Sequence, residues 1–150
     1  NGPLRSYLVR RCKDLGIEIQ ITGFLPHHKA LCLTREHFDV LVLPRIRLET
    51  TSTIVPIKVV EMLALGIPVV VTDLPAYKSF EGKGLYTAKR DPKEFANVIH
   101  HILSKYPDNV ESLVHKVLKS YTYEYNVKKF LELALKLYNK NNLHCYDKEN

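Results

Sequence analysis

The chain has 150 residues, of which 45% are hydrophobic and 25% charged, and this composition predicts one soluble globular domain with a real core. No apolar run approaches the roughly 18 to 20 residues of a membrane span, and the three widely spaced cysteines form neither a disulfide framework nor a metal motif, which favours a cytoplasmic setting. The formal charge of +6 indicates an anionic partner without choosing among nucleotide phosphates, nucleic acid and an acidic membrane surface.

Helix and strand patterns alternate along the chain and predict an α/β fold. In chain order we expect helix 3–15, strand 17–21, helix 28–37, strand 38–43, helix 56–65, strand 68–72, short helix 76–80, strand 85–88, and helices 92–105, 109–120 and 123–139. Alternation of this kind indicates right-handed βαβ units in a doubly wound, Rossmann-like parallel sheet with helices on both faces. We expect this domain to span residues 1–140 and a frayed tail to follow at 141–150.

The strand patterns differ in a way that predicts their places in the sheet. Residues 17–21 alternate isoleucine with polar residues, which is typical of a sheet edge, whereas residues 38–43 and 68–71 are almost continuously apolar and should be interior. Ligands of such sheets bind beyond the C-terminal strand ends. The loops expected to face a ligand are therefore residues 22–27, 44–55 and 73–76.

The segment from Thr53 to Asp73 carries the strongest functional signal. Its helix begins at Pro56, behind three hydroxyl residues at 51–53 that offer N-caps, and Gly66 suits a left-handed C-cap. Pro68 then blocks any continuation of the helix. A helix N-terminus at a strand end presents free N–H groups and a favourable dipole to a phosphate. The segment therefore predicts a nucleotide site.

Four stretches, taken in order, resemble the C-terminal, donor-binding domain of retaining GT-B glycosyltransferases of the glycosyl transferases group 1 family. They are Asn1–Arg5, Ile21–Leu25, Phe38–Pro44 and Pro56–Val70. Each stretch alone is weak, but their order and spacing together are specific, and the resemblance covers roughly residues 1 to 105. It implies transfer of a hexose from a UDP- or GDP-sugar to an unknown acceptor, with retention, and no metal or other cofactor.

The resemblance also implies a set of donor-binding residues. They are Glu61, Lys58, Ile57, Val55, Ile54, Thr53, Gly23, Phe24, Leu25 and Arg45. Glu61 would accept hydrogen bonds from the ribose hydroxyls, a task suited to an ionised carboxylate. Lys58 would contact the phosphate, although a surface pair with Glu61 at i, i+3 explains it as well.

Two further groups have competing interpretations. Arg45 and Arg47 follow a strand end, where guanidinium groups bind phosphates bidentately, or they are ordinary exposed loop arginines. Gly23, Phe24 and Leu25 line the base in the resembling family, with core packing of Phe24 as the alternative. His27 and His28 have no ligand set around them, so no metal site is predicted.

The catalytic residue is not identified by the sequence. The family commonly has a first glutamate at the position that Thr53 occupies here, and threonine is no carboxylate. Relatives with the Pro-x-Lys-x-x-Glu variant of residues 56–61 also lack that acid, so its loss does not exclude activity. Glu49 is a weak substitute because its spacing is wrong.

The chain reads as an N-terminally incomplete domain. Gly2-Pro3 is a turn that normally follows a strand, and the strand order 3-2-1-4-5-6 would place two further strands between residues 17–21 and 38–43. The acceptor domain would be missing too, so the chain alone should not turn over. The alternatives are a non-catalytic subunit that completes a split glycosyltransferase with a partner chain and, less favoured, a nucleotide-sugar epimerase.

Basic residues concentrate in the first helix and the C-terminal helices. They are either solvated helix faces or a peripheral contact with anionic lipid at the inner membrane face. No nucleic-acid-binding motif accompanies them, so nucleic acid is not predicted as a partner.

Overall fold

A computed structural model of the chain describes residues 2–80, 82–105 and 110–146. The chain divides into two compact units, Asn1–Phe38 and Asp39–Asn150, which we call unit 1 and unit 2. Unit 1 holds helices α1 (Arg5–Asp14) and α2 (His27–His37). Unit 2 holds the sheet and all the later helices.

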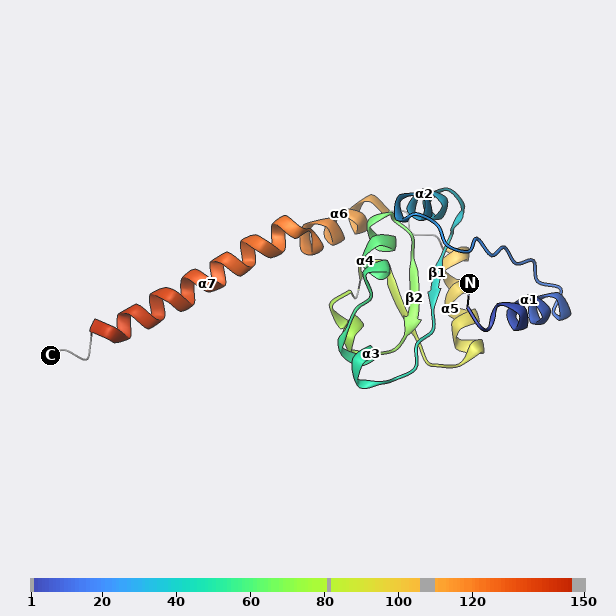
Figure 1. The fold of residues 1–150 in the computed structure, drawn as a ribbon, viewed down its shortest axis with the longest axis horizontal. Coiled ribbons are helices and arrows are strands. Elements are labelled where there is room, and N and C mark those ends of the chain that lie inside the picture. The colour runs from blue at the N-terminus through green and yellow to red at the C-terminus, as the bar shows by residue number, and fades with distance from the viewer. Residues whose placement is uncertain (1, 81, 106–109, 147–150) are drawn as a thin grey trace. The chain divides into compact units, whose positions relative to one another are not determined.

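Unit 2 is built on a parallel sheet of three strands in the order β1-β2-β3. Its elements are β1 (Leu41–Leu43), α3 (Glu49–Thr53), α4 (Ile57–Ala64), β2 (Val69–Thr72), the 3₁₀ helix η1 (Pro75–Phe80), β3 (Leu85–Ala88), α5 (Pro92–Ser104), α6 (Val110–Tyr121) and α7 (Tyr123–Tyr146). Helices α4 and α5 lie on opposite faces of the sheet (Figure 1). The predicted α/β class, with a parallel sheet and helices on both faces, is confirmed.

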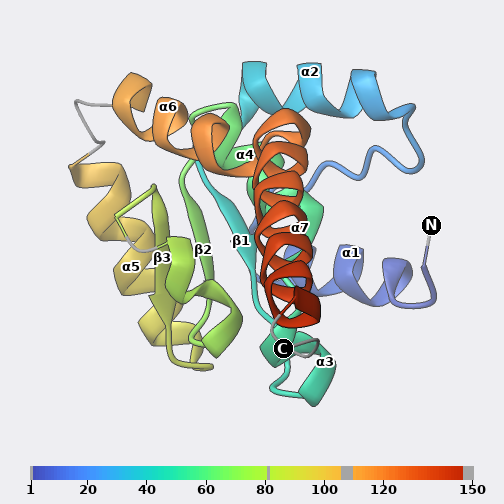
Figure 2. The ribbon, with the colours of Figure 1, turned by 90° about the vertical axis from the view of Figure 1, so that its left-hand side faces the viewer.

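The core of unit 2 is centred on β2. Val69, Val70 and Val71 are completely buried. Val70 packs with Phe95 and Ile102 of α5, and strand alternation turns its two neighbours toward the α4 face. Figure 2 shows β2 between the other two strands. The expected interior position of this strand is confirmed.

β1 is an edge strand, so the expected interior position of residues 38–43 is wrong. Its only hydrogen-bonded neighbour in the described sheet is β2, and the side chain of Val42 is 41% exposed. An open hollow of about 570 Å³ lies beside it, with Val42, Phe95 and Ile99 in its lining. A continuous apolar run shows that both faces of a strand are apolar, but it does not show how many strands flank it.

The predicted strand at residues 17–21 is also wrong. These residues follow α1 without joining a described strand, and Ile17 and Ile19 are 54% and 39% exposed. The Ile17 N–H instead donates to the Cys12 carbonyl and closes the end of α1. An alternating sequence forms a strand only when a neighbouring strand receives its backbone hydrogen bonds.

Helix α4 ends as its sequence predicts. Gly66 has φ +80°, its N–H donates to the Leu63 carbonyl, and the Ile67 N–H donates to the Met62 carbonyl. This pair of hydrogen bonds is a Schellman motif, which requires a left-handed residue just past the helix. The last carbonyls of α4 are therefore satisfied before β2 begins.

The last residue of α6 is attached to η1. The rings of Tyr121 and Phe80 stack with centroids 4.5 Å apart, and the Tyr121 hydroxyl donates to Ser79 Oγ at 3.2 Å. The ammonium group of Lys83 lies 5.2 Å from the Tyr121 ring centroid, within the range of a cation–π contact. These contacts hold the C-terminal end of α6 against the loop that follows β2.

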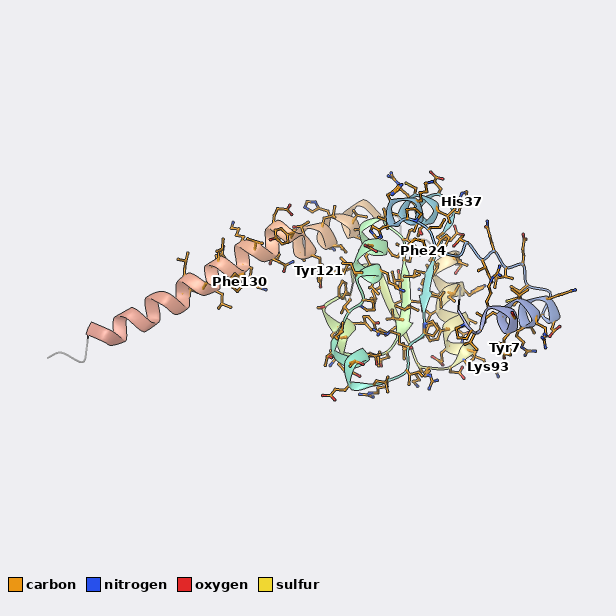
Figure 3. All side chains as sticks on the ribbon, viewed as in Figure 1. Tyr7, Phe24, His37, Lys93, Tyr121 and Phe130 are labelled. Atoms are coloured by element: carbon orange, nitrogen blue, oxygen red, sulfur yellow. The ribbon has the colours of Figure 1, made fainter. Side chains whose placement is uncertain are left out.

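One residue, Thr122, separates α6 from α7, which continues to Tyr146, beyond its expected end at 139 and past the start of the expected tail at 141. Residues 147–150 lie outside the described residues. Tyr123 and Phe130 are 80% and 68% exposed, and Phe130 projects from the helix (Figure 3). Within the described part of the chain, no helix combines the length and the apolar character needed to cross a membrane.

Candidate functional site

The N-terminus of α4 follows β1 and α3 along the chain and has no side-chain cap. Its N-cap is Pro56, with φ −64° and ψ 139°, and its first turn holds no acidic residue. The backbone N–H groups of Ile57 and Lys58 donate to no described residue. Two unpaired donors and a helix dipole therefore point out of the start of this helix, an arrangement that favours a bound anion.

Arg45 brings a fixed positive charge close to this helix start. Its backbone N–H donates to Thr72 Oγ1 at 2.8 Å, which joins the loop after β1 to the buried end of β2. Its side-chain Nη1 donates to the Ile54 carbonyl at 3.3 Å, just ahead of the residues that begin α4. The structure thus joins Arg45 to the end of β2 and to Ile54, three residues before α4 begins.

The loop between β1 and α4 contains the short helix α3, which the sequence analysis missed. The hydroxyls of Thr51 and Thr53 form hydrogen bonds within α3 and its entry loop. Helix α4 has no side-chain cap, so the expected capping by residues 51–53 is wrong. Thr51 Oγ1 accepts from the Leu48 N–H at 2.8 Å and donates to the Ile46 carbonyl at 2.6 Å. Thr51 is 8% exposed, so these two bonds fix the loop from inside.

Thr53, at the position of the family's first glutamate, is the last residue of α3. Its hydroxyl donates to the Glu49 carbonyl at 3.0 Å, four residues back, and the side chain is exposed. A threonine in this arrangement supplies neither a nucleophile nor a general base. Glu49 lies in the first turn of the same helix, exposed to solvent.

The exposed side of α4 carries the remaining candidates of this helix. Ile57 is 70% exposed, Lys58 is exposed and Glu61 is half-buried. Glu61 follows Ile57 by four residues and Lys58 by three, so it neighbours both on the helix surface. Lys58 forms no ion pair with a described residue, so the surface Lys58–Glu61 pair is not formed. Val55, just before the helix, is half-buried.

The candidates for the base lie in unit 1, in the segment that leads into α2. Gly23 has φ +69°, so its backbone takes the left-handed conformation that favours glycine. Phe24 is 93% exposed and Leu25 is half-buried. The alternative interpretation of Phe24 as a core residue is therefore wrong.

Comparison with known proteins gives one match. A family model described as "Glycosyl transferases group 1" matches residues 1–105 of this chain. The chain belongs to the glycosyl transferases group 1 family. No curated protein and no solved structure matches it. The resemblance found in the sequence is thus confirmed for the family, whose general chemistry is glycosyl transfer from a nucleotide-sugar donor.

Thr72 is the residue of this glycosyltransferase domain that sequence reasoning missed. It ends a run of three buried valines, and a polar residue in that position is 5% exposed only because Arg45 supplies its hydrogen bond. The signal available beforehand was a threonine closing a buried strand at the edge where ligands bind. Elsewhere among the described residues, no three His, Cys, Asp or Glu side chains gather closely enough to hold a metal ion.

Proposed function

We propose that this member of the glycosyl transferases group 1 family binds the donor, a UDP- or GDP-sugar, and that a hexose is transferred from it to an acceptor with retention. The observation that carries the proposal is the α4 N-terminus, where two N–H groups donate to no described residue and the Arg45 guanidinium is bonded to the Ile54 carbonyl, three residues before the helix. A diphosphate brings two negative charges, and this combination of dipole and fixed cation suits it. Lys58 would add a second cation.

The other contacts follow from the position of the diphosphate. Glu61, one turn along α4, would accept hydrogen bonds from the ribose hydroxyls. Residues 53–55 and Ile57 would border the donor, and the Gly23–Leu25 segment stays the candidate for the base that the family resemblance implies. Thr53 would contribute a hydroxyl and no acid, which leaves the catalytic group to a part of the enzyme outside this set of residues.

The test is calorimetric titration of the folded chain with UDP, GDP and ADP. We expect binding of UDP or GDP, and we expect Glu61→Ala to weaken it about ten- to a hundredfold, since hydrogen bonds to a charged group contribute about 1.5 to 3 kcal/mol. The matched control is Glu124→Ala, which removes an exposed glutamate from α7 and should leave the affinity unchanged.

Two results would contradict the proposal. One is an unchanged affinity in Glu61→Ala, which would remove this residue from the site. The other is a lack of binding to all three nucleotides by a chain whose circular dichroism shows it to be folded.

The alternative is a non-catalytic subunit that completes a split glycosyltransferase with a partner chain. The open edge of β1, with Val42 41% exposed, favours it, because an unpaired edge can accept a further strand. Both versions propose that the chain is inactive without an acceptor domain or a partner. Recovery of a stoichiometric second polypeptide on purification would favour the subunit, and sugar transfer by the chain alone would contradict both.

We also propose a cytoplasmic location at the inner face of a membrane. Cys12 and Cys32 are free thiols, as expected in a reducing compartment, and the net charge of +6 suits an anionic surface. Fractionation of cells that express the protein would test this by its distribution between the cytosolic and membrane fractions.

A further inference from the structure

Helix α7 exposes large apolar side chains along its described part. Tyr123, Phe130, Leu131 and Leu135 are 53% to 80% exposed, and none of residues 123–136 is buried. Figure 3 shows the Phe130 side chain projecting from the ribbon of this helix. A helix in a globular unit normally buries its apolar side, so this exposure indicates an interaction surface.

The apolar and charged side chains of α7 lie on different sides of the helix. At 3.6 residues per turn, the apolar side spans about 200° and the charged side chains from Glu124 to Lys129 span about 140°, with overlap only at Glu124. The apolar side is formed by Tyr123, Val127, Phe130, Leu131, Leu133, Ala134 and Leu135. Two residues depart from this division. Tyr125 lies among the charges, and Asn126, within the apolar side, donates from its amide to the Thr122 carbonyl at 2.9 Å.

Two neighbouring rows run along the border between these sides. The apolar row has a member every four residues, at Tyr123, Val127, Leu131 and Leu135. The charged row follows one residue behind it, at Glu124, Lys128, Glu132 and Lys136. An open groove of about 480 Å³ is lined by residues of both rows. Within the described residues, no ion pair occupies a member of the charged row, so its charges are available to a partner.

The charged row is complementary to itself when the helix is reversed about Phe130. Glu124 and Lys136 lie six residues before and after Phe130, and Lys128 and Glu132 lie two residues before and after it. Two antiparallel copies centred there would place Glu124 of each beside Lys136 of the other, and Lys128 beside Glu132. A parallel pair would place every charge beside its own copy, which is repulsive. The charges therefore favour the antiparallel arrangement.

We propose that α7 is a dimerisation helix that packs antiparallel against α7 of a second copy of this chain, with the apolar row buried between them and the two charged rows paired along one side. A two-fold interface needs such self-complementarity, because every contact in it occurs twice with the copies exchanged. An anionic membrane needs none, and it would repel Glu124 and Glu132 at the border of the apolar side. The inference goes beyond the proposed nucleotide site and does not depend on it.

The experiment is sedimentation equilibrium of the full chain at increasing protein concentration, for which we expect a monomer–dimer equilibrium. Lys128→Glu should weaken the dimer about tenfold, because two attractive pairs with Glu132 become repulsive in each dimer. The matched control is Lys129→Glu, which makes the same change of charge one residue outside the charged row and should alter the affinity by less than about twofold. Leu131→Gln, at unchanged charge, should weaken the dimer by more than about tenfold, since each dimer loses two buried leucines.

Exchange of the two charges makes the outcome decisive. Glu132→Lys alone should weaken the dimer as Lys128→Glu does, whereas the two changes combined in one chain should restore it, because the pairs form again with their signs exchanged. An equimolar mixture of the two single variants should form mixed dimers for the same reason. Circular dichroism of each variant checks that α7 remains helical.

Four results would each overturn the proposal. They are a monomer at every concentration, equal weakening by Lys128→Glu and Lys129→Glu, no recovery in the combined charge exchange, and an unchanged dimer in Leu131→Gln. A parallel dimer is among the excluded arrangements, because residues 128 and 132 would then meet their own copies and the single charge reversals would leave the affinity unchanged.

Discussion

The two ends of helix α4 differ in whether their backbone polar groups have hydrogen-bond partners. At its C-terminus, the left-handed Gly66 and the hydrogen bonds from the Gly66 and Ile67 N–H groups satisfy the last carbonyls, and Leu63 beside them is 3% exposed. At its N-terminus, Pro56 provides no side-chain cap, Ile57 is 70% exposed, and the Arg45 guanidinium donates to the Ile54 carbonyl three residues ahead of the helix. One end of the helix is closed and the other is prepared for a ligand.

This difference separates the residues of α4 that stabilise the domain from those that are available to a ligand. Buried polar groups without partners cost free energy, so a fold closes its helix ends wherever nothing else will bind there. An end that is left open, and lies where parallel strands finish, is the end that a ligand can complete. Substitutions at the two ends should therefore separate unfolding free energy from nucleotide affinity.

The largest effect is expected at the closed end. Leu63→Ala should lower the free energy of unfolding by about 2 to 5 kcal/mol, because a buried leucine is replaced by a cavity. Denaturant unfolding would measure it, with Leu103→Ala, at a 53% exposed position on α5, as the control of small effect. Nucleotide affinity of the folded fraction should stay unchanged, and a loss of affinity as large as in Glu61→Ala would contradict the separation.

Thr72→Val tests whether ligand binding at the N-terminus of α4 depends on the hydrogen bond between Thr72, at the end of β2, and Arg45. The valine has the shape of threonine but leaves the Arg45 N–H without its acceptor, which should cost about 1 to 3 kcal/mol of stability. We also expect severalfold weaker binding of UDP or GDP, since the loop that carries the guanidinium loses its attachment. Thr87→Val, at an exposed position of β3, is the matched control. If both variants behave alike, Thr72 does not position the loop.

The smallest effect is expected at Gly66. Alanine in the left-handed conformation costs about 1 to 2 kcal/mol, and the reduced freedom of the unfolded chain returns about 0.4 to 1. Gly66→Ala should thus lower the unfolding free energy by about 1 kcal/mol, and Gly66→Asn should lose less, because asparagine tolerates this backbone region. Equal losses in the two variants would show that backbone conformation is not the cause.

Local patterns predicted α4, its C-cap at Gly66 and β2 well, because helix periodicity, a glycine stop and a buried valine run are all set by neighbouring residues. The patterns failed for strands, because the position of a strand depends on the strands beside it. Residues 17–21 have a strand pattern but no described strand beside them, and residues 38–43 are apolar enough for an interior strand yet form an edge. The sequence of one strand alone does not determine which strands it pairs with.

The candidate site shows the same division. Lys58 and Glu61 could be placed on one helix because helix periodicity and a family pattern both cover them, and their roles stay predictions. The short helix α3 and the Thr72–Arg45 bond could not, since α3 depends on side-chain hydrogen bonds within the loop and the Thr72–Arg45 bond joins that loop to β2. The N-terminus of α4 is left open because Thr51 and Thr53 form their hydrogen bonds within α3 and its entry loop.

The attachment of Tyr121 to η1 has a consequence for how the chain folds. Tyr121 and Ser79 are 42 residues apart, and closing a loop of that length costs about 3 kcal/mol of chain entropy before the ring stack with Phe80 offsets it. During synthesis, the Phe80 ring therefore stays uncovered by Tyr121 until the end of α6 has been made. We expect the sheet to form first and α6 to dock onto it afterwards. Until α6 docks, the exposed Phe80 ring is the apolar surface that a chaperone would bind.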